Sequence, residues 1–245
     1  MVELVDTLDL KSGDFVLCGF ESRSGQFSKF KRTFKMKILC LSDTHNQHPR
    51  LEILPEFDLL IYAGDATMKG RLYEYHHFGE WLNTIKQPKA VLLGNHDVND
   101  FQHHSLIPEK KTVEILGLKI WAWSGSSFRR FPHEIPRSNG PKWWNNWADP
   151  SVQKNTFAQI PENLDILITH TPPYKILDYC PGGCVGDPEL KEALNNLKKP
   201  PKLHVFGHIH ESRGQMFARG TLHVNASYLD GRYQIWNKPF EIVEL

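Results

Sequence analysis

Five short clusters of metal-binding side chains, each directly after a run of aliphatic or β-branched residues, constrain this chain more than any other feature. The runs are 38–41, 59–62, 91–93, 166–168 and 203–206. Such a run, bounded by turn residues, is typical of a buried strand. The clusters that follow them are Asp43–His45, Gly64–Asp65, Gly94–Asp97, His170 and Gly207–His210. Open α/β sheets place their sites beyond the carboxyl ends of the strands, so the pattern predicts one shared site.

The side chains in these clusters are oxygen and nitrogen donors that suit a pair of metal ions. Residues i and i+2 of an extended segment share a face, so Asp43 lies with His45, and His208 with His210. A mixture of carboxylate oxygen and imidazole nitrogen favours Mn²⁺, Fe or Zn²⁺ over Mg²⁺ or Ca²⁺. Any one of these residues alone would be typical of a cap or a loop. Together they predict a metal centre built from Asp43, His45, Asp65, Asn95, His170, His208 and His210.

Two metal ions about 3.5–4 Å apart can activate water and neutralise both oxygens of an in-line displacement, which is the chemistry of phosphate ester hydrolysis. The Asp65 carboxylate has one oxygen for each ion and can bridge them. His96 is left without a metal, and beside a bound phosphate it can stabilise charge or protonate the leaving group. Asp97 can orient His96 or an adjacent ligand. We therefore predict His96 and Asp97 as catalytic residues, with Asn95 and His96 in contact with the substrate.

The ordered clusters resemble the pattern of the calcineurin-like metallophosphoesterase superfamily, which is D-x-H, G-D, G-N-H-[DE], H and G-H-x-H. The resemblance spans 36–245, with every block intact. It implies an α/β fold, a four-layer α/β/β/α sandwich, and a dinuclear centre in which Mn²⁺ is the favoured metal over Fe or Zn. It also implies that one ion is bound by Asp43, His45 and His210, that the other is bound by Asn95, His170 and His208, and that Asp65 bridges them.

A closer likeness to the animal metallophosphoesterase-domain-containing proteins and their bacterial relatives rests on 165–173, 202–211 and 224–227. Some animal members carry Gly at the position of His208, which weakens one metal site. This chain retains His208, so we expect both ions. The subgroup includes cyclic nucleotide phosphodiesterases, so the resemblance implies cleavage of small diesters such as cyclic nucleotides. A phosphomonoesterase or protein phosphatase, and a scaffold that has lost catalysis, remain the alternatives.

Between the clusters, strands alternate with helices in the first half, and the second half is mixed or antiparallel β. We expect two sheets packed face to face with helices outside. Leu72, Tyr75, Leu82 and Ile85 should share one face of a helix over 72–85. A hairpin is expected over 112–123, a short helix over 150–160, and a helix from Asp187-Pro188, where Asp can cap it. Further strands are expected at 215–218, 221–225, 233–235 and 241–243.

Residues outside the strand ends are expected to set specificity or to be structural. Arg129 and Arg130 either reach a phosphate or form a solvated basic turn. Trp143, Trp144 and Trp147 either form a wall for a base or cover a sheet edge. His204 should be a hydrogen-bonded interior residue of its strand, whereas His76 and His77 should be solvated on a helix.

Composition limits the location and the partners. A net charge of +1 in 245 residues gives no electrostatic reason for a polyanion partner, so we expect a small phosphate ester substrate and no stable nucleic-acid partner. Four irregularly spaced cysteines predict a reducing compartment. Cys180 and Cys184 favour an ordinary turn over a zinc site. No apolar run approaches the roughly 20 residues that cross a bilayer, so a cytoplasmic protein is expected.

The first 35 residues lack the apolar periodicity of the remainder. Their opening resembles peptides that arise when a transfer-RNA gene is translated. We expect residues 1–35 to be either a disordered extension or an artefact of gene annotation, with the natural start at Met36, and residues 36–245 to form the metallophosphoesterase domain.

Overall fold

Two β-sheets form the centre of the unit that begins at Met36. The computed structural model describes residues 35–48, 54–97, 102–124, 126–127, 147–148 and 150–245. The first sheet has the order β14-β1-β2-β3. Its strands are β1 (Lys37–Leu41), β2 (Leu59–Ala63), β3 (Lys89–Leu92) and β14 (Glu241–Glu244). β1, β2 and β3 run parallel, so their carboxyl ends meet at one edge, and β14 pairs with β1 in the antiparallel sense.

The second sheet has the order β12-β13-β11-β8-β5-β4 and is mixed, as predicted. Its strands are β4 (Thr112–Ile115), β5 (Leu118–Trp123), β8 (Ile166–Thr169), β11 (Leu203–Phe206), β12 (Gly214–Ala218) and β13 (Thr221–Asn225). The four central strands are parallel, and the edge strands β4 and β12 are antiparallel to their neighbours. The described residues also form β6 (Ser126–Ser127) paired with β7 (Trp147–Ala148), and β9 (Tyr179–Cys180) paired with β10 (Gly183–Cys184).

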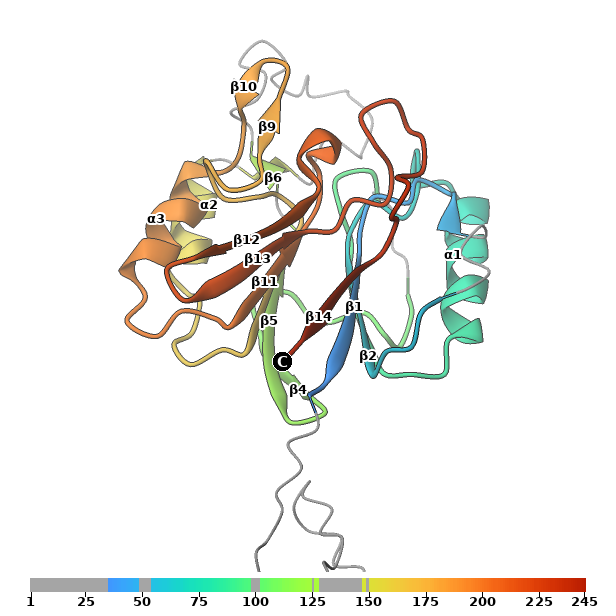
Figure 1. Cartoon of the computed structure of the whole chain (residues 1–245), viewed down its shortest axis with the longest axis horizontal. Coiled ribbons are helices and arrows are strands. Elements are labelled where there is room, and N and C mark those ends of the chain that lie inside the picture. The colour runs from blue at the N-terminus through green and yellow to red at the C-terminus, as the bar shows by residue number, and fades with distance from the viewer. Residues whose placement is uncertain (1–34, 49–53, 98–101, 125, 128–146, 149) are drawn as a thin grey trace, which may run out of the picture. The chain divides into compact units, whose positions relative to one another are not determined.

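The two sheets pack face to face, and helices cover the outer face of each (Figure 1). Alternate residues of each strand point in opposite directions. Ile38 and Cys40 of β1 therefore enter the core between the sheets, whereas Leu39 packs towards α1 (Leu72–Thr84). On the other sheet, Trp121 packs towards α2 (Pro150–Phe157) and α3 (Pro188–Asn196). Burial on both faces explains the continuous apolar runs in the sequence. The four-layer α/β/β/α sandwich is confirmed.

The predicted elements are confirmed except in two places. Asp187 caps α3 as expected, since its side chain accepts hydrogen bonds from the next turn. Leu72 does not share the buried face of α1, because it precedes Phe78 by six residues and lies about 120° around the helix from it; its side chain is 81% exposed. The strand expected at 233–235 is also wrong: only an isolated bridge between Leu229 and Ile235 forms there.

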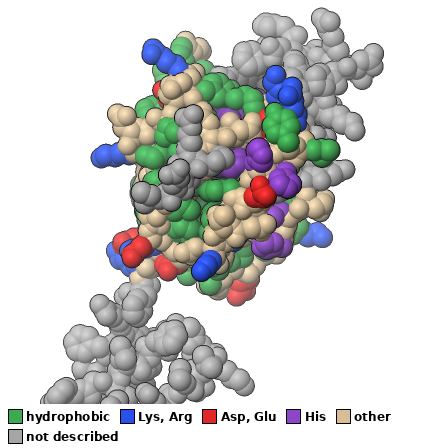
Figure 2. Space-filling model, turned by 90° about the vertical axis from the view of Figure 1, so that its right-hand side faces the viewer, with side chains coloured by type: hydrophobic (Ala, Val, Ile, Leu, Met, Phe, Trp, Pro, Cys, Tyr) green, Lys and Arg blue, Asp and Glu red, His purple; other side chains and the backbone are tan. Residues whose placement is uncertain are grey.

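The outer face of α1 is solvated, as predicted for His76 and His77. His76 forms an exposed ion pair with Glu80 at 3.3 Å. Figure 2, which shows the side on which α1 lies in Figure 1, has histidine and acidic side chains together on this face. Exposed pairs of this kind contribute little to stability.

No helix among the described residues has the length and apolar character needed to cross a membrane. Cys180 and Cys184 are free thiols on the two strands of the β9–β10 hairpin, which is the ordinary turn that the sequence favoured. Residues 1–34 lie outside the described residues, as does the expectation made for them.

Candidate metal centre

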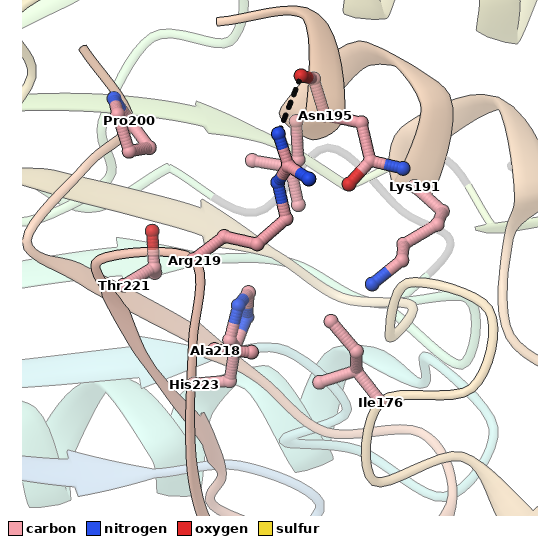
Figure 3. A pocket seen from close by; sticks show the side chains of 9 residues that line it. Ile176, Lys191, Asn195, Pro200, Ala218, Arg219, Thr221 and His223 are labelled. Carbon is pink, nitrogen blue, oxygen red and sulfur yellow. Dashed lines mark hydrogen bonds between the residues drawn. The ribbon is translucent and has the colours of Figure 1, made fainter. Parts of the chain in front are cut away.

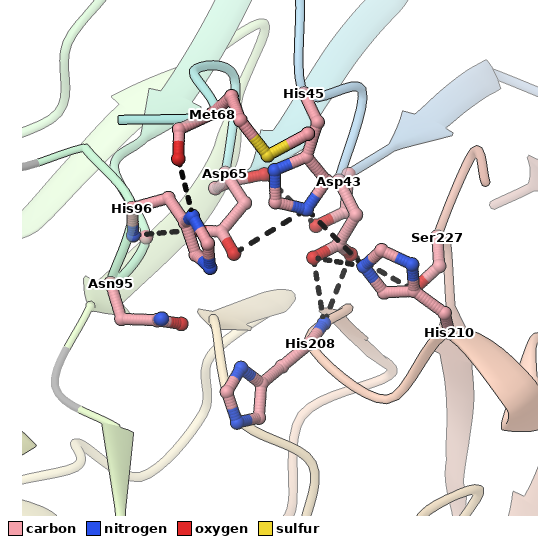
Figure 4. Close-up of polar contacts among 12 residues, drawn as sticks. Asp43, His45, Asp65, Met68, Asn95, His96, His208, His210 and Ser227 are labelled. Atoms are coloured by element: carbon pink, nitrogen blue, oxygen red, sulfur yellow. Dashed lines mark hydrogen bonds and ion pairs between the residues drawn. The ribbon is translucent and has the colours of Figure 1, made fainter. Parts of the chain in front are cut away.

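All the predicted metal ligands follow the carboxyl ends of parallel strands, at the same end of the two sheets. Figure 4 labels these residues except His170. β1, β2 and β3 of the first sheet lead to Asp43 and His45, to Asp65, and to Asn95. β8 and β11 of the second sheet lead to His170, and to His208 and His210. Because the sheets pack face to face, the two sets of side chains point towards one another. The structure therefore brings the predicted side chains of the two sheets together.

Sharp turns at the strand ends bring the ligands together. Asp43, Asp65 and His208 adopt positive φ angles of 52°, 57° and 68°. A left-handed backbone at a non-glycine residue costs on the order of 1 kcal/mol and is typical of functional sites. Gly64 has φ 103°, and a Cβ there would lie 2.6 Å from His170 Nδ1. A Cβ at Gly207 would collide with the Asp43 carboxylate. A side chain at either position would therefore displace a candidate ligand.

Three groups of donor atoms form among the described residues, and each includes an acidic side chain. One of them, His45, Asp65 and His96, shares a residue with each of the other two. Asp43, His45 and His210 offer ligand atoms that all lie within 4.8 Å of one another, and Asp65, His170 and His208 form a second such group. The Oδ2 atom of Asp65 lies 3.2 Å from Nε2 of His170 in its own group. It also lies 3.8 Å from Nε2 of His45 in the first group. The geometry thus fits two cations that share Asp65.

Asn95 belongs with the second group of donor atoms. Its Oδ1 atom lies 2.9 Å from His170 Nε2. A neutral amide oxygen beside an imidazole nitrogen is a reasonable donor set for a divalent transition metal.

Three of the candidate histidine rings are oriented so that their Nε2 atoms are available to a cation. Nδ1 lies 3.1 Å from Thr67 O in His45, 2.8 Å from Ala63 O in His170, and 3.1 Å from Asp230 O in His210. A carbonyl oxygen only accepts, so Nδ1 carries the hydrogen and the lone pair of the neutral ring lies on Nε2. Metal-binding histidines commonly show this arrangement.

The spacing of these lone pairs supplies a test of whether the donors fit a metal. His45 Nε2 and His210 Nε2 lie 3.3 Å apart. His170 Nε2 similarly faces oxygen atoms of Asp65 and Asn95. Lone pairs at this separation repel unless a proton or a cation lies between them. The residues therefore fit a dinuclear centre.

The electrostatics of the site also suit cations. Burial raises the pKa of Asp43, but the hydrogen bond and charge of His210 outweigh it and hold that pKa below its usual range. Burial likewise opposes ionisation of Asp65, and the charge of His170 reverses this, so the pKa of Asp65 lies well below normal. In the described part of the chain, the ion pairs of both carboxylates are with histidines. Two buried carboxylates without a permanent cationic partner favour metal binding.

The pKa values of His45 and His170 shift in opposite directions in this site. Burial lowers the pKa of His45 to about 4, against the raising effect of Asp65, so its ring is neutral and ready to bind a metal at neutral pH. Burial also lowers the pKa of His170, but the charge of Asp65 prevails and raises it to about 9. A proton thus competes with a cation for the position between His170 and Asp65.

His96 lies next to both groups with one ring nitrogen already engaged. Its Nδ1 atom lies 2.7 Å from Met68 O, and its ring meets that of His45 edge-on at 4.8 Å (Figure 4). His96 N also donates to Asp65 Oδ1 at 2.9 Å. These contacts fix the orientation of the ring beside the donor groups.

Asp97 joins two loops of the site. Its carboxylate accepts hydrogen bonds from the backbone N–H groups of Ala66, Thr67 and Gly94, at 2.9–3.1 Å, and from the Thr67 hydroxyl at 2.8 Å. Burial and the negative charge of Asp65 raise the pKa of Asp97 to about 6, against the effect of these donors. Asp97 thus positions the loops that carry Asp65 and Asn95.

Ser227 is a residue of the site that the sequence analysis did not single out. Its hydroxyl donates to Asp43 Oδ2 at 2.8 Å, and it is fully buried. Asn225, at the end of β13, donates to Ile209 O at 2.8 Å beside the metal ligands. The signal was present, because Asn225-Ala226-Ser227 also follows a strand. Asn and Ser are so common in turns that the pattern was not counted as a further cluster.

Other predicted contacts lie elsewhere or outside the described residues. Arg129, Arg130, Trp143 and Trp144 are outside them, and the side chain of Trp147 is not described. His204 is buried and lies 2.9 Å from the Thr169 hydroxyl, as expected of an interior residue.

A recess beside α3 contains none of the predicted metal ligands. It has about 250 Å³ of space, part of it open to solvent, and is lined by Lys191, Arg219 and His223 among others (Figure 3). Arg219 donates to Asn195 O there at 3.2 Å. The metal centre is therefore the site where the predicted chemistry converges.

Comparison with known proteins decides the family. The family model described as calcineurin-like phosphoesterase matches residues 36–212, which include every cluster described above. The chain belongs to the calcineurin-like phosphoesterase family. It is therefore a metal-dependent phosphoesterase of a family that uses a dinuclear metal centre.

Relatives extend this result. Human metallophosphoesterase domain-containing protein 1 is 32% identical over 235 residues, covering 84% of this chain and 70% of the human protein. A probable cyclic nucleotide phosphodiesterase of Xenorhabdus bovienii is 34% identical over 61 residues, a quarter of each chain. The crystal structure of phosphopantetheinyl hydrolase from Mycobacterium tuberculosis has a TM-score of 0.56 at 14% identity, covering 85% of this chain and 96% of that one. This last likeness shows the fold alone.

Proposed function

We propose that this calcineurin-like phosphoesterase is a phosphodiesterase that cleaves small diesters such as cyclic nucleotides, with Mn²⁺ favoured over Fe or Zn²⁺. The observation that carries the proposal is the pair of donor groups that meet at Asp65, with His96 beside them. In this proposal Asp43, His45 and His210 would hold one ion, Asn95, His170 and His208 would hold the other, and Asp65 would serve both. The likeness to the probable cyclic nucleotide phosphodiesterase of Xenorhabdus bovienii adds support for a cyclic nucleotide.

When bound, a pair of metal ions supplies positive charge for the phosphate oxygens and activates water near neutral pH. The protein's own residues do the rest. Asp97 holds the loops of Asp65 and Asn95 at a fixed distance, so the donors need little rearrangement. Asn95 and His96 contact the phosphate in this proposal, and Arg129 and Arg130 remain proposed contacts that the described residues do not include.

His96 is the proposed acid for the leaving oxygen. The carbonyl of Met68 lies 2.7 Å from Nδ1 and accommodates a positive ring, because a carbonyl oxygen accepts from an imidazolium. Protonated Nε2 then faces the site and can donate. An alkoxide leaving group such as that of a ribose ester is a strong base, so protonation assists its departure. This role requires an ester of an alcohol, and monoesters and diesters of alcohols both meet the requirement.

A substrate panel with saturating Mn²⁺ tests the proposal. It contains bis-p-nitrophenyl phosphate, 2′,3′- and 3′,5′-cyclic nucleotides, and p-nitrophenyl phosphate as the monoester. We expect faster turnover of the diesters and loss of activity in Asp65→Ala. For His96→Ala, with its metal content retained, we expect kcat to fall about 10²- to 10⁴-fold on the cyclic nucleotides, whose alkoxide leaving groups need a proton. The matched control is His76→Ala on the solvated face of α1, which should retain full activity.

The panel has two contrary outcomes. Faster turnover of the monoester would favour the phosphomonoesterase alternative over the diesterase. No turnover of any phosphate ester with Mn²⁺, Fe²⁺ or Zn²⁺ would remove the catalytic proposal and favour a scaffold.

A further inference from the structure

Tyr233 places an aromatic ring at the solvent-facing rim of the metal centre. Its ring centroid lies 5.1 Å from that of His45 and 5.2 Å from that of His210, with interplanar angles of 61° and 62°. Both histidines are buried, whereas Tyr233 is 40% exposed. The ring therefore borders the first donor group on the side that an incoming ligand meets.

The backbone of Tyr233 is held in a costly conformation. Its φ is +59°, in the left-handed region that a bulky residue rarely adopts. Tyr233 N donates to Asp230 O at 2.9 Å, and Gln47 Nε2 donates to Tyr233 O at 3.0 Å. The Asp230 side chain accepts from the N–H groups of Arg232 and Gln234, at 2.8 and 2.9 Å. These bonds replace the extended backbone that the sequence predicted at this position.

The loop that carries Tyr233 is tied to the metal ligands on both sides. Asp230 O faces His210 Nδ1 at 3.1 Å, and a Cβ at Gly231 would lie 2.9 Å from the Glu211 side chain. Gln47 extends the turn that contains His45. An exposed aromatic ring is thus fixed in position relative to two candidate ligands. Strain that surrounding contacts maintain at a site points to a use for the strained residue.

We propose that Tyr233 determines specificity by packing against a planar aromatic group of the substrate, such as a nucleobase or an aryl ester, while the phosphate lies at the metal centre. The inference rests on the proposed function and adds the chemical class of the group beside the phosphate. Aromatic rings attract one another in offset or edge-to-face arrangements beyond the area they bury. A ring held by the backbone loses little freedom when a ligand binds, so the attraction is retained in the affinity.

Two diesters with the same leaving group test this inference: p-nitrophenyl phenyl phosphate and p-nitrophenyl methyl phosphate, with saturating Mn²⁺. The measured quantity is the ratio of their kcat/KM values. We expect Tyr233→Leu to lower the phenyl-to-methyl ratio by about 3- to 10-fold, the size of an aromatic pair contribution, and Tyr233→Phe to retain it. The matched control is Phe217→Leu, because Phe217 is 72% exposed on β12, towards the end of that strand away from Asn225.

A second readout does not depend on turnover. Calorimetric binding of phenyl phosphate and of methyl phosphate to the Mn²⁺-loaded full chain should show the same loss of preference in Tyr233→Leu. Metal content is measured for every variant. An unchanged phenyl-to-methyl preference overturns the inference, whether or not Tyr233→Leu loses metal, since metal loss alone marks a structural role. Equal losses in the Leu and Phe variants also overturn it, because the hydroxyl would then be responsible.

The two proposals fail separately. If the unmodified protein cleaves no diester, the proposed function falls, and the binding preference still decides the role of Tyr233. If diesters are cleaved and the preference does not depend on the ring at Tyr233, only the present inference falls.

Discussion

Asp97→Asn tests whether the connection between two loops of the metal centre contributes to stability and to metal affinity. One carboxylate oxygen accepts from Thr67 N and Thr67 Oγ1, and the other accepts from the N–H groups of Ala66 and Gly94. Asp97 is 2% exposed, so bulk water cannot replace a lost acceptor. An amide has the same shape, but one of its two positions is an NH₂ donor.

The expected loss of stability follows from the better of the two orientations that the new amide group can adopt in the Asp97→Asn variant. The amide oxygen can accept from Ala66 N and Gly94 N, and the NH₂ group can donate to the Thr67 hydroxyl, which leaves Thr67 N facing a donor. An unpaired buried N–H group costs about 1–3 kcal/mol, and the exchange of charged for neutral acceptors costs about 1 kcal/mol more. We therefore expect the Mn²⁺-loaded protein to lose about 2–4 kcal/mol in its free energy of unfolding.

Asp97→Asn should reduce the stability of the metal-free protein by less. Without metal, the negative charge of Asp65 repels Asp97, and together with burial it raises the pKa of Asp97 to about 6. Substitution by a neutral amide removes that repulsion and offsets part of the cost. The difference between the two states must appear as weaker metal binding. A 10- to 100-fold loss of Mn²⁺ affinity is the usual effect of changing a group behind the ligands.

Urea unfolding with saturating Mn²⁺ measures the loss of stability of the loaded protein, and urea unfolding with a chelator measures that of the metal-free protein. A Mn²⁺ titration measures the metal affinity. The matched control is Asp165→Asn, because Asp165 accepts from Lys119 N at 2.9 Å just before β8, away from the carboxyl ends of the strands. We expect the control to change stability by less than about 1 kcal/mol in both states. Unchanged stability of Mn²⁺-loaded Asp97→Asn would refute the reasoning. A changed pH profile of kcat with unchanged stability would instead indicate a catalytic Asp97.

Two further predictions follow from packing and from buried histidines. Gly207→Ala places a methyl group against the Asp43 carboxylate, so we expect a loss of about 10²-fold or more in activity, together with weaker metal binding. The control is Gly182→Ala, whose added Cβ meets no atom within 4 Å, and it should change neither the activity nor the thermal unfolding. Burial, followed by the charge of Lys191, lowers the pKa of His223 to about 4, and burial and His223 lower that of His204. Between pH 6.5 and 4 the unfolded chain therefore binds more protons, and stability falls as the pH falls, by up to about 1.4 kcal/mol per pH unit for each histidine. When the pH is lowered from 7 to 5, the free energy of unfolding of His223→Gln should fall by about 2 kcal/mol less than that of the unmodified protein. Equal falls for the two proteins, measured by chemical unfolding, would contradict this.

Much of the metal centre could be predicted because its ligands follow strands whose burial is evident in the sequence. Ile38 and Leu39 lie on opposite faces of β1, yet both are fully buried, so the run before Asp43 is apolar throughout. Parallel pairing then places every strand end at one edge. His170 and His208 follow the neighbouring parallel strands β8 and β11, so strand pairing places their segments side by side.

Other features depend on tertiary contacts that no local pattern encodes. The sequence at Tyr233 favours a strand, but hydrogen bonds from Gln47 and within the Asp230 turn impose a left-handed backbone. Leu72 fits a helical repeat, yet the buried face is determined by Phe78 and its neighbours against the sheet. Ser227 follows β13 as an ordinary turn residue would, and its bond to Asp43, a residue 184 positions away, identifies it as part of the site.

Anomalous diffraction from crystals of the full chain containing Mn²⁺ is the most direct measurement of the dinuclear centre. Two peaks roughly 3.5–4 Å apart are expected, one on each side of the Asp65 carboxylate. One should lie against His45 and His210, and the other against His170 and His208. A single peak, or peaks that Asp65 does not join, would contradict the proposed centre.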